Sequence, residues 1–354
     1  MNLHERYMRR CLDLARMAQK NVSPNPMVGA VIVVDNKIVG EGHTSAYGGP
    51  HAEVNAVEDV LQTYGMHRGK ELLRSSTVYV SLEPCAHHGK TPPCTDLLIE
   101  NQVANVVVGC LDPFKKVNGQ GVQQLREAGI QVTVGVLEQE CKAMNRRFFT
   151  RIGKFRPYVI LKWAQTADGY FAPTEAAQKW ISNKASKHLV HKWRSEEDAI
   201  LVGKHTAIID NPSLTTRLWQ GKSPTRILID KNLEVPTNHT FFNNDNTDIL
   251  IFNALKASWE DNKKYIQVEN FDLYLPQNIL YQLYLMDIQS LIIEGGKKTL
   301  ESFIEADLWD EARVFVGPEE WNNGIEAPKL PNKPILTQKV SSDTLKLYQN
   351  NNSY

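Results

Sequence analysis

The sequence predicts two α/β domains in one chain, and two observations carry this prediction. The chain has 354 residues, a length that suggests about two or three domains. In both halves, short apolar runs that read as strands alternate with helical patterns, which favours sheets covered by helices on both faces. The pattern changes around residues 141–156. We therefore place one domain at 1–145, a linker at 146–156 and a second domain at 157–354.

The composition is that of a soluble globular protein, with 42% hydrophobic and 23% charged residues. The formal net charge is +0, so the chain as a whole has no excess positive charge that would attract nucleic acid. A small-molecule substrate is therefore favoured. No apolar run reaches the roughly 20 residues of a membrane span, and the N-terminus lacks the apolar core of a signal peptide. The cysteines, all within the first 141 residues, do not form a secreted disulfide framework. We expect a cytoplasmic protein in which Cys11, Cys110 and Cys141 are buried thiols.

Apolar periodicity and turn residues set the expected elements. In the first half, helices are expected at 4–20, from His51 to about 61, from Thr95 and around 122–128, with strands at 28–34, 38–42, 77–82, 103–109 and 130–136. In the second half, strands are expected at 158–164, 199–203, 226–230 and 290–294. The asparagines at 350–352 are expected to form a frayed end.

One histidine and two cysteines occupy positions suited to a zinc site. His51 lies at the start of a predicted helix and Cys85 directly after a predicted strand, with Cys94 nine residues further on. Helix N-termini favour thiolates, and one imidazole with two thiolates holds zinc with a fourth position open. Glu53 is placed to take a proton from water and deliver it to departing ammonia. Taken singly, a His-x-Glu is usually a solvated helix pair and a Pro-Cys a buried thiol, but together they predict a metal site.

The order of these residues is typical of zinc-dependent nucleobase deaminases, which usually have two residues between the cysteines. Here eight intervene. The segments 23–29, 42–53 and 85–94 closely resemble the riboflavin-biosynthesis pyrimidine deaminases, in which the longer loop accompanies recognition of a phosphorylated ribosyl-aminopyrimidine. The resemblance implies a cytidine-deaminase-like three-layer α/β/α domain, one zinc ion per chain, and hydrolytic deamination of a ribosyl-diaminopyrimidine phosphate to the corresponding uracil.

The resemblance also implies substrate contacts in this half. Asn25 offers a donor and an acceptor to an aminopyrimidinone edge, and His43, His87 and Lys90 supply cations for a ribose phosphate. The alternatives are a turn residue for Asn25 and a solvated loop lysine for Lys90. Where the family usually reads Asp-Pro-Asn-Pro, this chain has Asp-Pro-Phe-Lys-Lys at 112–116.

Two passages in the second half run from an apolar strand through glycine into a helix. One leads from 199–203 into Lys204-His205-Thr206, and the other from 290–294 into Gly295-Gly296. Helix N-termini with free N–H groups suit a diphosphate, although neither passage is a Gly-x-Gly-x-x-Gly fingerprint. A simple strand-to-helix turn is the alternative. The residues alone predict an α/β domain in which anion binding stays open.

This half is similar to the riboflavin-pathway reductase, which has a dihydrofolate-reductase-like α/β fold and uses NADPH to reduce the ribosyl group to ribityl. The similarity rests on Lys162-x-Ala164-x-Thr166-x-Asp168-Gly169, Trp180-Ile181-Ser182, His191-x-x-Arg194, Gly203-x-x-Thr206, Asp210-Asn211-Pro212 and Glu294-Gly295-Gly296. It implies NADPH contacts at Ala164, Trp180, Thr206, Asp210, Gly296, Lys297, Lys298, Thr299, Leu300, Glu301 and Ser302. It implies reductase substrate contacts at Lys162, Gln178, Arg194, Leu214, Arg217 and Glu294.

Chemistry supports several of these assignments. Guanidinium forks suit phosphate, so Arg194 and Arg217 are interpreted as a second phosphate clamp. Lys162 and Glu294 are candidates for polarising the sugar oxygen or passing its proton, with an ordinary buried ion pair as the alternative. Gln178 stands where the family usually carries serine.

The leading hypothesis is a bifunctional enzyme of riboflavin biosynthesis, expected to be a homo-oligomer. One alternative is a nucleic-acid or tRNA deaminase, which the neutral charge and the spacing of the cysteines disfavour. Another is a C-terminal half that is a non-catalytic binding or dimerisation module.

Overall fold

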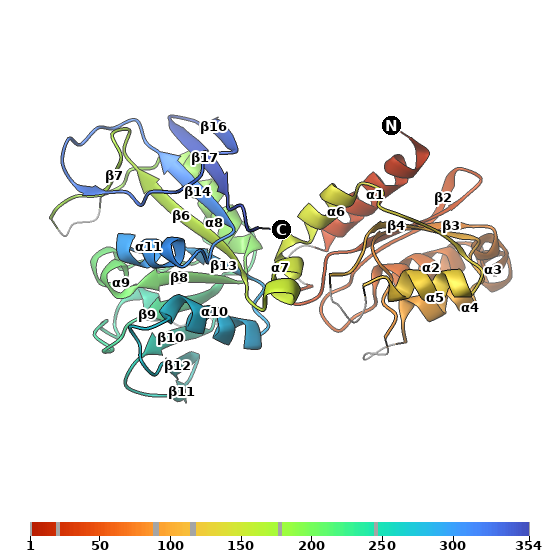
Figure 1. The fold of residues 1–354 in the computed structure, drawn as a ribbon, viewed down its shortest axis with the longest axis horizontal. Helices are drawn as coiled ribbons and strands as arrows, with labels where there is room; N and C mark the ends of the chain where they lie inside the picture. The colour runs from red at the N-terminus through yellow and green to blue at the C-terminus, as the bar shows by residue number, and fades with distance from the viewer. Residues whose placement is uncertain are drawn as a thin grey trace. The chain divides into compact units, whose positions relative to one another are not determined.

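The structure is a computed structural model that describes residues 2–18, 22–87, 92–113, 118–175, 179–243 and 247–353. The chain folds into two compact units, one ending at Lys154 and the other spanning Phe155–Ser353 (Figure 1). Helix α7, Arg146–Lys154, occupies most of the stretch interpreted as a linker, so this stretch is helical. Within the described ranges, no helix is both long and apolar enough to cross a membrane.

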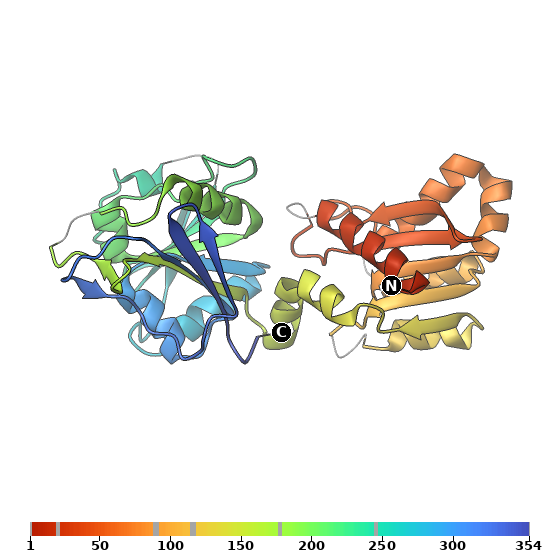
Figure 2. The same ribbon diagram turned by 90° about the horizontal axis from the view of Figure 1, so that it is seen from above.

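The first unit is a five-stranded sheet between two layers of helices. The strand order is β2-β1-β3-β4-β5, in which β1 is antiparallel to β2 and β3, whereas β3, β4 and β5 are parallel. Helices α1 and α6 cover one face and α2, α4 and α5 the other (Figure 1 and Figure 2), which confirms the predicted three-layer α/β/α fold. The strands are β1 (Gly29–Val34), β2 (Lys37–His43), β3 (Thr77–Leu82), β4 (Asn105–Cys110) and β5 (Gln131–Val134). The helices before α7 are α1 (Leu3–Met17), α2 (Ala52–Tyr64), α3 (Met66–Arg74), α4 (Cys94–Glu100), α5 (Gln120–Glu127) and α6 (Glu138–Met144).

A glycine lets helix α2 pack directly on strand β2. A Cβ atom at Gly42 would lie 2.3 Å from the carbonyl oxygen of Ala52, too close for any side chain. Ala52 and Ala56 are fully buried and present only methyl groups. The start of α2, with His51 and Glu53, is thereby fixed against the sheet. Helix α3 was not predicted, because its nine residues include a glycine and mostly polar side chains.

The second unit is built on a ten-stranded sheet in the order β11-β12-β10-β9-β8-β13-β6-β14-β17-β16. The strands from β12 to β14 in this order are parallel, and the antiparallel strands lie at its two edges. The main strands are β6 (Tyr158–Gln165), β8 (Ala199–Gly203), β9 (Thr225–Ile229), β10 (Ile249–Asn253), β12 (Lys263–Gln267), β13 (Ser290–Ile293) and β14 (Glu311–Val316). The remaining strands are β7 (Tyr170–Ala172), β11 (Ser258–Glu260), β15 (Ile325–Glu326), β16 (Leu336–Val340) and β17 (Asp343–Gln349), and β7 pairs with β15.

Helices cover both faces of this sheet, as predicted. Alternate side chains of β6 point to opposite faces, so Val159 and Leu161 join one core and Tyr158 and Ile160 the other. Helices α10 (Leu275–Leu285) and α11 (Lys297–Glu305) fill the first core. Helices α8 (Lys184–Glu196) and α9 (Lys204–Asp210), with the 3-10 turn Thr240–Phe242, fill the second.

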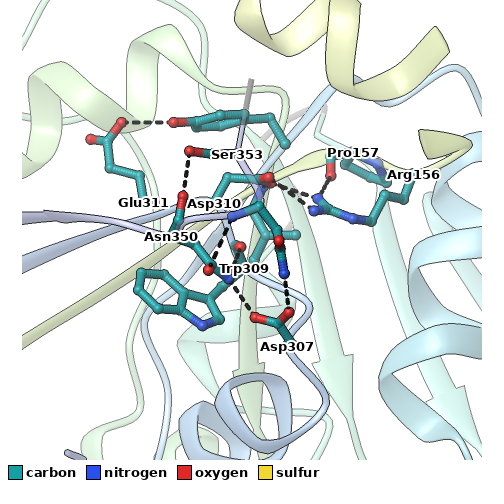
Figure 3. Close-up of polar contacts among 11 residues, drawn as sticks. Arg156, Pro157, Asp307, Trp309, Asp310, Glu311, Asn350 and Ser353 are labelled. Carbon is teal, nitrogen blue, oxygen red and sulfur yellow. Dashed lines mark hydrogen bonds and ion pairs between the residues drawn. The ribbon is translucent and has the colours of Figure 1, made fainter. Parts of the chain in front are cut away.

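A buried ion pair ties the first strand of this unit to β14 (Figure 3). Arg156 donates from Nη1 and Nη2 to the carboxylate of Asp310 at 2.6 and 2.9 Å, and the same carboxylate accepts from the N–H of Val159 at 2.8 Å. Asn350 was predicted to belong to a frayed end, and this prediction is wrong. Its side chain is buried and donates to Asp307 and to the carbonyl oxygen of Trp309.

Candidate active sites

Three potential zinc ligands lie close together in the first unit, near the end of strand β3 and the N-termini of helices α2 and α4. His51 is the N-cap of α2, Cys85 follows β3 and Cys94 is the first residue of α4. Nδ1 of His51 lies 3.6 Å from Sγ of Cys85 and 3.3 Å from Sγ of Cys94. The donor atoms of all three residues lie within 4.8 Å of one another. The structure therefore brings together the three side chains that the sequence selected.

This donor set has the dimensions that zinc requires. In a tetrahedral site with Zn–S of about 2.3 Å and Zn–N of about 2.0–2.1 Å, nitrogen and sulfur ligands are about 3.6 Å apart. The two nitrogen–sulfur distances at His51 are close to this value. One nitrogen and two sulfurs also leave a fourth ligand position, as a catalytic zinc needs.

The sulfurs are prepared for metal binding by their hydrogen bonds. The main-chain N–H of Cys94 donates to Sγ of Cys85 at 3.3 Å. The hydrogen bond from the Cys94 thiol lowers the pKa of Cys85 to about 4, and this bond together with burial raises the pKa of Cys94 well above its usual range. Zinc is bound by thiolates, so metal binding releases any proton that these sulfurs carry.

Glu53 lies buried beside this cluster, with 4% of its surface exposed. Burial, and then the negative charge on Cys85, raise its pKa to about 7. The side chain also interacts with the thiol of Cys94. A carboxyl group with a pKa near neutrality can both accept and release a proton at physiological pH, which is what general acid–base catalysis requires.

The remaining predicted residues of this site lie around the cluster or outside the described residues. Asn25 donates its main-chain N–H to Val22, and His43 contacts the carbonyl oxygen of Thr44 through Nδ1. Within the described ranges, neither side chain bonds to the zinc ligands. His87 is exposed. Lys90 and residues 114–116 lie outside the described residues.

The second unit contains a cavity of about 720 Å³ at the ends of β6, β8 and β13. In open α/β sheets, ligands bind beyond the carboxyl ends of the parallel strands. Eight of the predicted residues line this cavity: Lys162, Trp180, Arg194, Thr206, Asp210, Leu214, Arg217 and Glu294. Gln178 lies outside the described residues.

The other predicted NADPH residues are not among those that line the cavity. Ala164 packs against the core, and Leu300 is fully buried in the core. Lys297–Ser302 belong to α11, where Lys297 pairs with Glu301 at 3.7 Å. Gly296 precedes that helix with φ +42, and a Cβ atom there would lie 3.3 Å from Oγ1 of Thr206, so its main chain approaches α9 closely.

An ion-pair network occupies the base of the cavity. Arg194 donates to both oxygens of Glu294, from Nε at 3.1 Å and from Nη2 at 2.8 Å, and its Nη1 donates to the carbonyl oxygen of Thr215. Nζ of Lys162 lies 3.7 Å from the same carboxylate. Burial opposes ionisation of Glu294, but the charges of Arg194 and Lys162 outweigh it and lower its pKa to about 2. Burial lowers the pKa of Lys162.

Two family models match the chain. The cytidine and deoxycytidylate deaminase zinc-binding region matches residues 1–110, and the RibD C-terminal domain matches residues 157–319. The riboflavin biosynthesis protein RibD of Aquifex aeolicus is 40% identical over 91% of this chain and 89% of its own length. The chain belongs to the RibD family.

Other RibD proteins agree with this assignment. RibD of Escherichia coli is 33% identical over 89% of this chain and 88% of its own length. A crystal structure from Thermotoga maritima, described as a diaminohydroxyphosphoribosylaminopyrimidine deaminase and 5-amino-6-(5-phosphoribosylamino)uracil reductase, is 35% identical with a TM-score of 0.87, covering 98% of both chains. The chain is accordingly a bifunctional deaminase and reductase of riboflavin biosynthesis, with a zinc-binding domain and a reductase domain that uses NADPH. The alternative of a nucleic-acid deaminase with a non-catalytic second half is not favoured.

Two residues that the sequence did not single out support the deaminase centre of this member of the RibD family. Asn145, 2% exposed, accepts the N–H of Met27 and donates to its carbonyl oxygen, both at 2.8 Å, and so holds the loop that carries Asn25. Glu83, two residues before Cys85, accepts main-chain N–H groups of Asp112, Gly119 and Val122 at 3.0–3.2 Å. For Glu83 the Glu-Pro-Cys run was a visible signal, whereas nothing in the sequence pointed to Asn145.

Asp168 plays a similar part beside the reductase cavity. Its Oδ2 accepts the N–H groups of Trp321 and Asn322 at 3.0 and 2.8 Å. The ammonium group of Lys179, which lines the cavity, lies 4.3 Å from the centre of the Trp321 ring. Asp168 therefore holds the 319–322 loop beside a cationic residue of the cavity.

Proposed function

We propose that the two units catalyse the two reactions named for the Thermotoga maritima relative, in succession. The N-terminal domain, predicted at 1–145, deaminates the diaminohydroxyphosphoribosylaminopyrimidine. The C-terminal domain, predicted at 157–354, reduces the resulting 5-amino-6-(5-phosphoribosylamino)uracil to its ribityl form. The observation that carries this proposal is the buried Glu53 carboxyl beside one nitrogen and two sulfur donors, in one chain with a cationic cavity.

In the deaminase, His51, Cys85 and Cys94 would hold the zinc ion, which would lower the pKa of the attacking water. Glu53 takes a proton from this water as the oxygen adds to the ring carbon that bears the amino group. It then delivers the proton to the departing amino nitrogen, so ammonia leaves and a carbonyl group remains. The raised pKa of Glu53 supports both transfers by one group.

The substrate is held by residues around this centre. We assign Asn25 to the pyrimidine edge, because its amide offers a donor and an acceptor. His43, His87 and Lys90 are assigned to the ribose phosphate, because a phosphorylated substrate needs cations at the mouth of the site. Asn145 supports the first assignment by fixing the main chain beside Asn25.

In the reductase, bound NADPH would supply the hydride that adds to the anomeric carbon of the ribosyl group. The bond from that carbon to the ring oxygen breaks, and the oxygen takes a proton. We assign this proton to Lys162, because burial lowers its pKa and makes its ammonium group a better donor. Glu294, 3.7 Å away, keeps Lys162 charged before the transfer.

The cofactor and the second substrate share the cavity in this proposal. NADPH is assigned to Ala164, Trp180, Thr206, Asp210 and the 296–302 turn, and the substrate to Lys162, Gln178, Arg194, Leu214, Arg217 and Glu294. Trp180 supports the cofactor assignment, since the residue is 61% exposed and the ring face away from the Lys187 ammonium group can stack on a planar group.

We also infer that the partners are small molecules and not nucleic acid, and that the chain works in the cytoplasm. The net charge of +0 supports the first inference. The free cysteines support a reducing compartment. Assembly into a homo-oligomer stays a prediction.

The test is a coupled assay on the full chain with the ribosyl-diaminopyrimidine phosphate, with and without NADPH. We expect deamination without NADPH and NADPH oxidation only after deamination. Glu53→Gln should keep one zinc per chain by elemental analysis, lose deamination, and still oxidise NADPH when the deaminated compound is supplied.

The matched control is Glu58→Gln, which makes the same change at an exposed position of the same helix. It should deaminate at the wild-type rate. Normal turnover by Glu53→Gln would show that another group moves the proton, and loss of zinc from that variant would make Glu53 a structural residue of the metal site.

A further inference from the structure

Helix α8 holds one segment of the reductase cavity at two main-chain points. Nδ1 of His191 accepts the main-chain N–H of Arg217 at 3.0 Å. One helical turn later, Nη1 of Arg194 donates to the carbonyl oxygen of Thr215 at 3.3 Å. Leu214, the first residue of this 214–217 segment, is buried and adopts φ +54, a backbone conformation that a non-glycine residue keeps only when its surroundings fix it. The 214–217 turn is therefore a fixed part of the cavity wall.

The two arginines of this wall differ in how far their charges are neutralised. Arg194 is bound by both oxygens of Glu294. Arg217 donates to a neutral group, Oγ1 of Thr215 at 3.0 Å, and among the described residues no carboxylate pairs with it. Arg217 is thus the arginine of this cavity whose charge is available to an anion, whereas Arg194 serves mainly to bind Glu294 and the turn.

His191 is held in one protonation state by what surrounds it. The groups that face it are Arg194 and His188 on its own helix, Arg217 on the turn and Glu294 after β13. Burial, and then the charges of Arg194 and Arg217, lower the pKa of His191 to about 4, against the pull of Glu294. The ring is therefore neutral at physiological pH. Because Nδ1 accepts a hydrogen bond, the proton of this neutral ring is on Nε2.

We propose that His191 is a positioning residue for the phosphate group of the reductase substrate. The neutral Nδ1 of His191 fixes the main chain of Arg217 by accepting its N–H. The fixed main chain then directs the Arg217 guanidinium group, which has no carboxylate partner among the described residues, into the cavity. A protonated imidazole would lose the acceptor, and it would add a charge that repels the arginine it positions. This inference rests on the proposed function, because it needs a phosphorylated substrate in this cavity.

The test compares two polar substitutions that differ in where they place an acceptor. His191→Asn keeps an amide oxygen near the position of Nδ1, whereas His191→Gln moves the amide out toward the position of Nε2. His188→Gln, an exposed residue on the same helix, is the matched control. The measurements are the KM and kcat for the deaminated substrate, the KM for NADPH, and inhibition by inorganic phosphate. The deaminase rate of each variant reports the integrity of the rest of the chain.

We expect His191→Gln to raise the KM for the substrate and the inhibition constant for phosphate by the same factor. That factor should be about two- to tenfold, the range that one lost hydrogen bond produces. The kcat and the KM for NADPH should stay unchanged, and His191→Asn and His188→Gln should behave like wild type. Equal behaviour of the Asn and Gln variants at position 191 would overturn the proposal, and so would a fall in kcat at constant KM. Absence of NADPH oxidation by the wild-type chain would instead refute the proposed function.

Discussion

Asp310→Asn should destabilise the reductase unit strongly, because the change leaves a buried guanidinium group without its counter-charge. The Asp310 side chain is fully buried, and that of Arg156 is 9% exposed. The carboxylate accepts both guanidinium bonds and the N–H of Val159 (Figure 3). An asparagine can keep the bond to Val159, but it cannot neutralise Arg156, and its amide N–H atoms face other donors. Breaking a buried pair in this way costs about 3–5 kcal/mol.

The tryptophans make this prediction measurable in the full chain. All seven lie between Trp163 and Trp321, so their fluorescence reports on the second unit alone. With a urea m-value of about 2 kcal/mol/M, the unfolding midpoint of Asp310→Asn should fall by about 2 M. The double variant Arg156→Met with Asp310→Asn removes the stranded charge and should regain part of the loss. A single variant that loses less than about 1 kcal/mol, or a double variant less stable than the single one, would refute this reasoning. Deaminase activity should remain in both.

Other perturbations test the two sites separately. Removing zinc with a chelator should abolish deamination while the chain still oxidises NADPH with the deaminated compound, and loss of both activities would contradict independent sites. Asn145→Ala frees both main-chain groups of Met27, so the deaminase KM should rise several-fold while the reductase is unchanged. Glu83→Gln places an amide N–H against main-chain donors, which should cost about 1–3 kcal/mol in the stability of the first unit, measured by hydrogen exchange. The pKa of Glu294 is lowered from 4.5 to about 2, so its ion pairs stabilise the folded reductase above pH 4.5, and this stabilisation is lost as the pH falls toward 2. The stability gap between wild type and Glu294→Gln should therefore narrow below pH 4.5, and a constant gap would contradict the ion-pair assignment.

The sequence predicted the clustering of His51, Cys85 and Cys94 well because each residue is next to an element that the sequence marks clearly. Cys85 follows an unbroken apolar strand, and His51 follows a glycine-proline run and precedes a helix. Parallel strands bring such positions to one edge of a sheet, so local signals were enough to place three residues together.

The supporting residues could not be found in this way. Asn145 and Met27 are 118 positions apart, and their contact depends on how α6 packs against the sheet. Asp168 and Asn322 are separated by 154 positions. Single asparagine and aspartate residues carry no periodic signal, since their partners are main-chain groups that every residue possesses. The error at Asn350 has the same origin, because polarity near a chain end was interpreted as exposure, whereas the side chain bonds to Asp307 and Trp309.

The net charge of the whole chain gives no indication of the local charge in the reductase cavity. The net charge is +0, yet the reductase cavity is lined by five cationic side chains and two carboxylates, a surplus of three positive charges. The cationic residues are Lys162, Lys179, Lys187, Arg194 and Arg217, and the acidic ones are Asp210 and Glu294. NADPH and a phosphorylated sugar are both strongly anionic, so this local surplus suits them in a protein without a net field. Glu294 neutralises positive charge at the base of the cavity, where Lys162 lies. Arg217, in the cavity wall, has no carboxylate partner among the described residues and keeps its full charge. In the function we propose, the position of the Glu294 carboxylate would separate a site for proton transfer at Lys162 from a site for phosphate at Arg217.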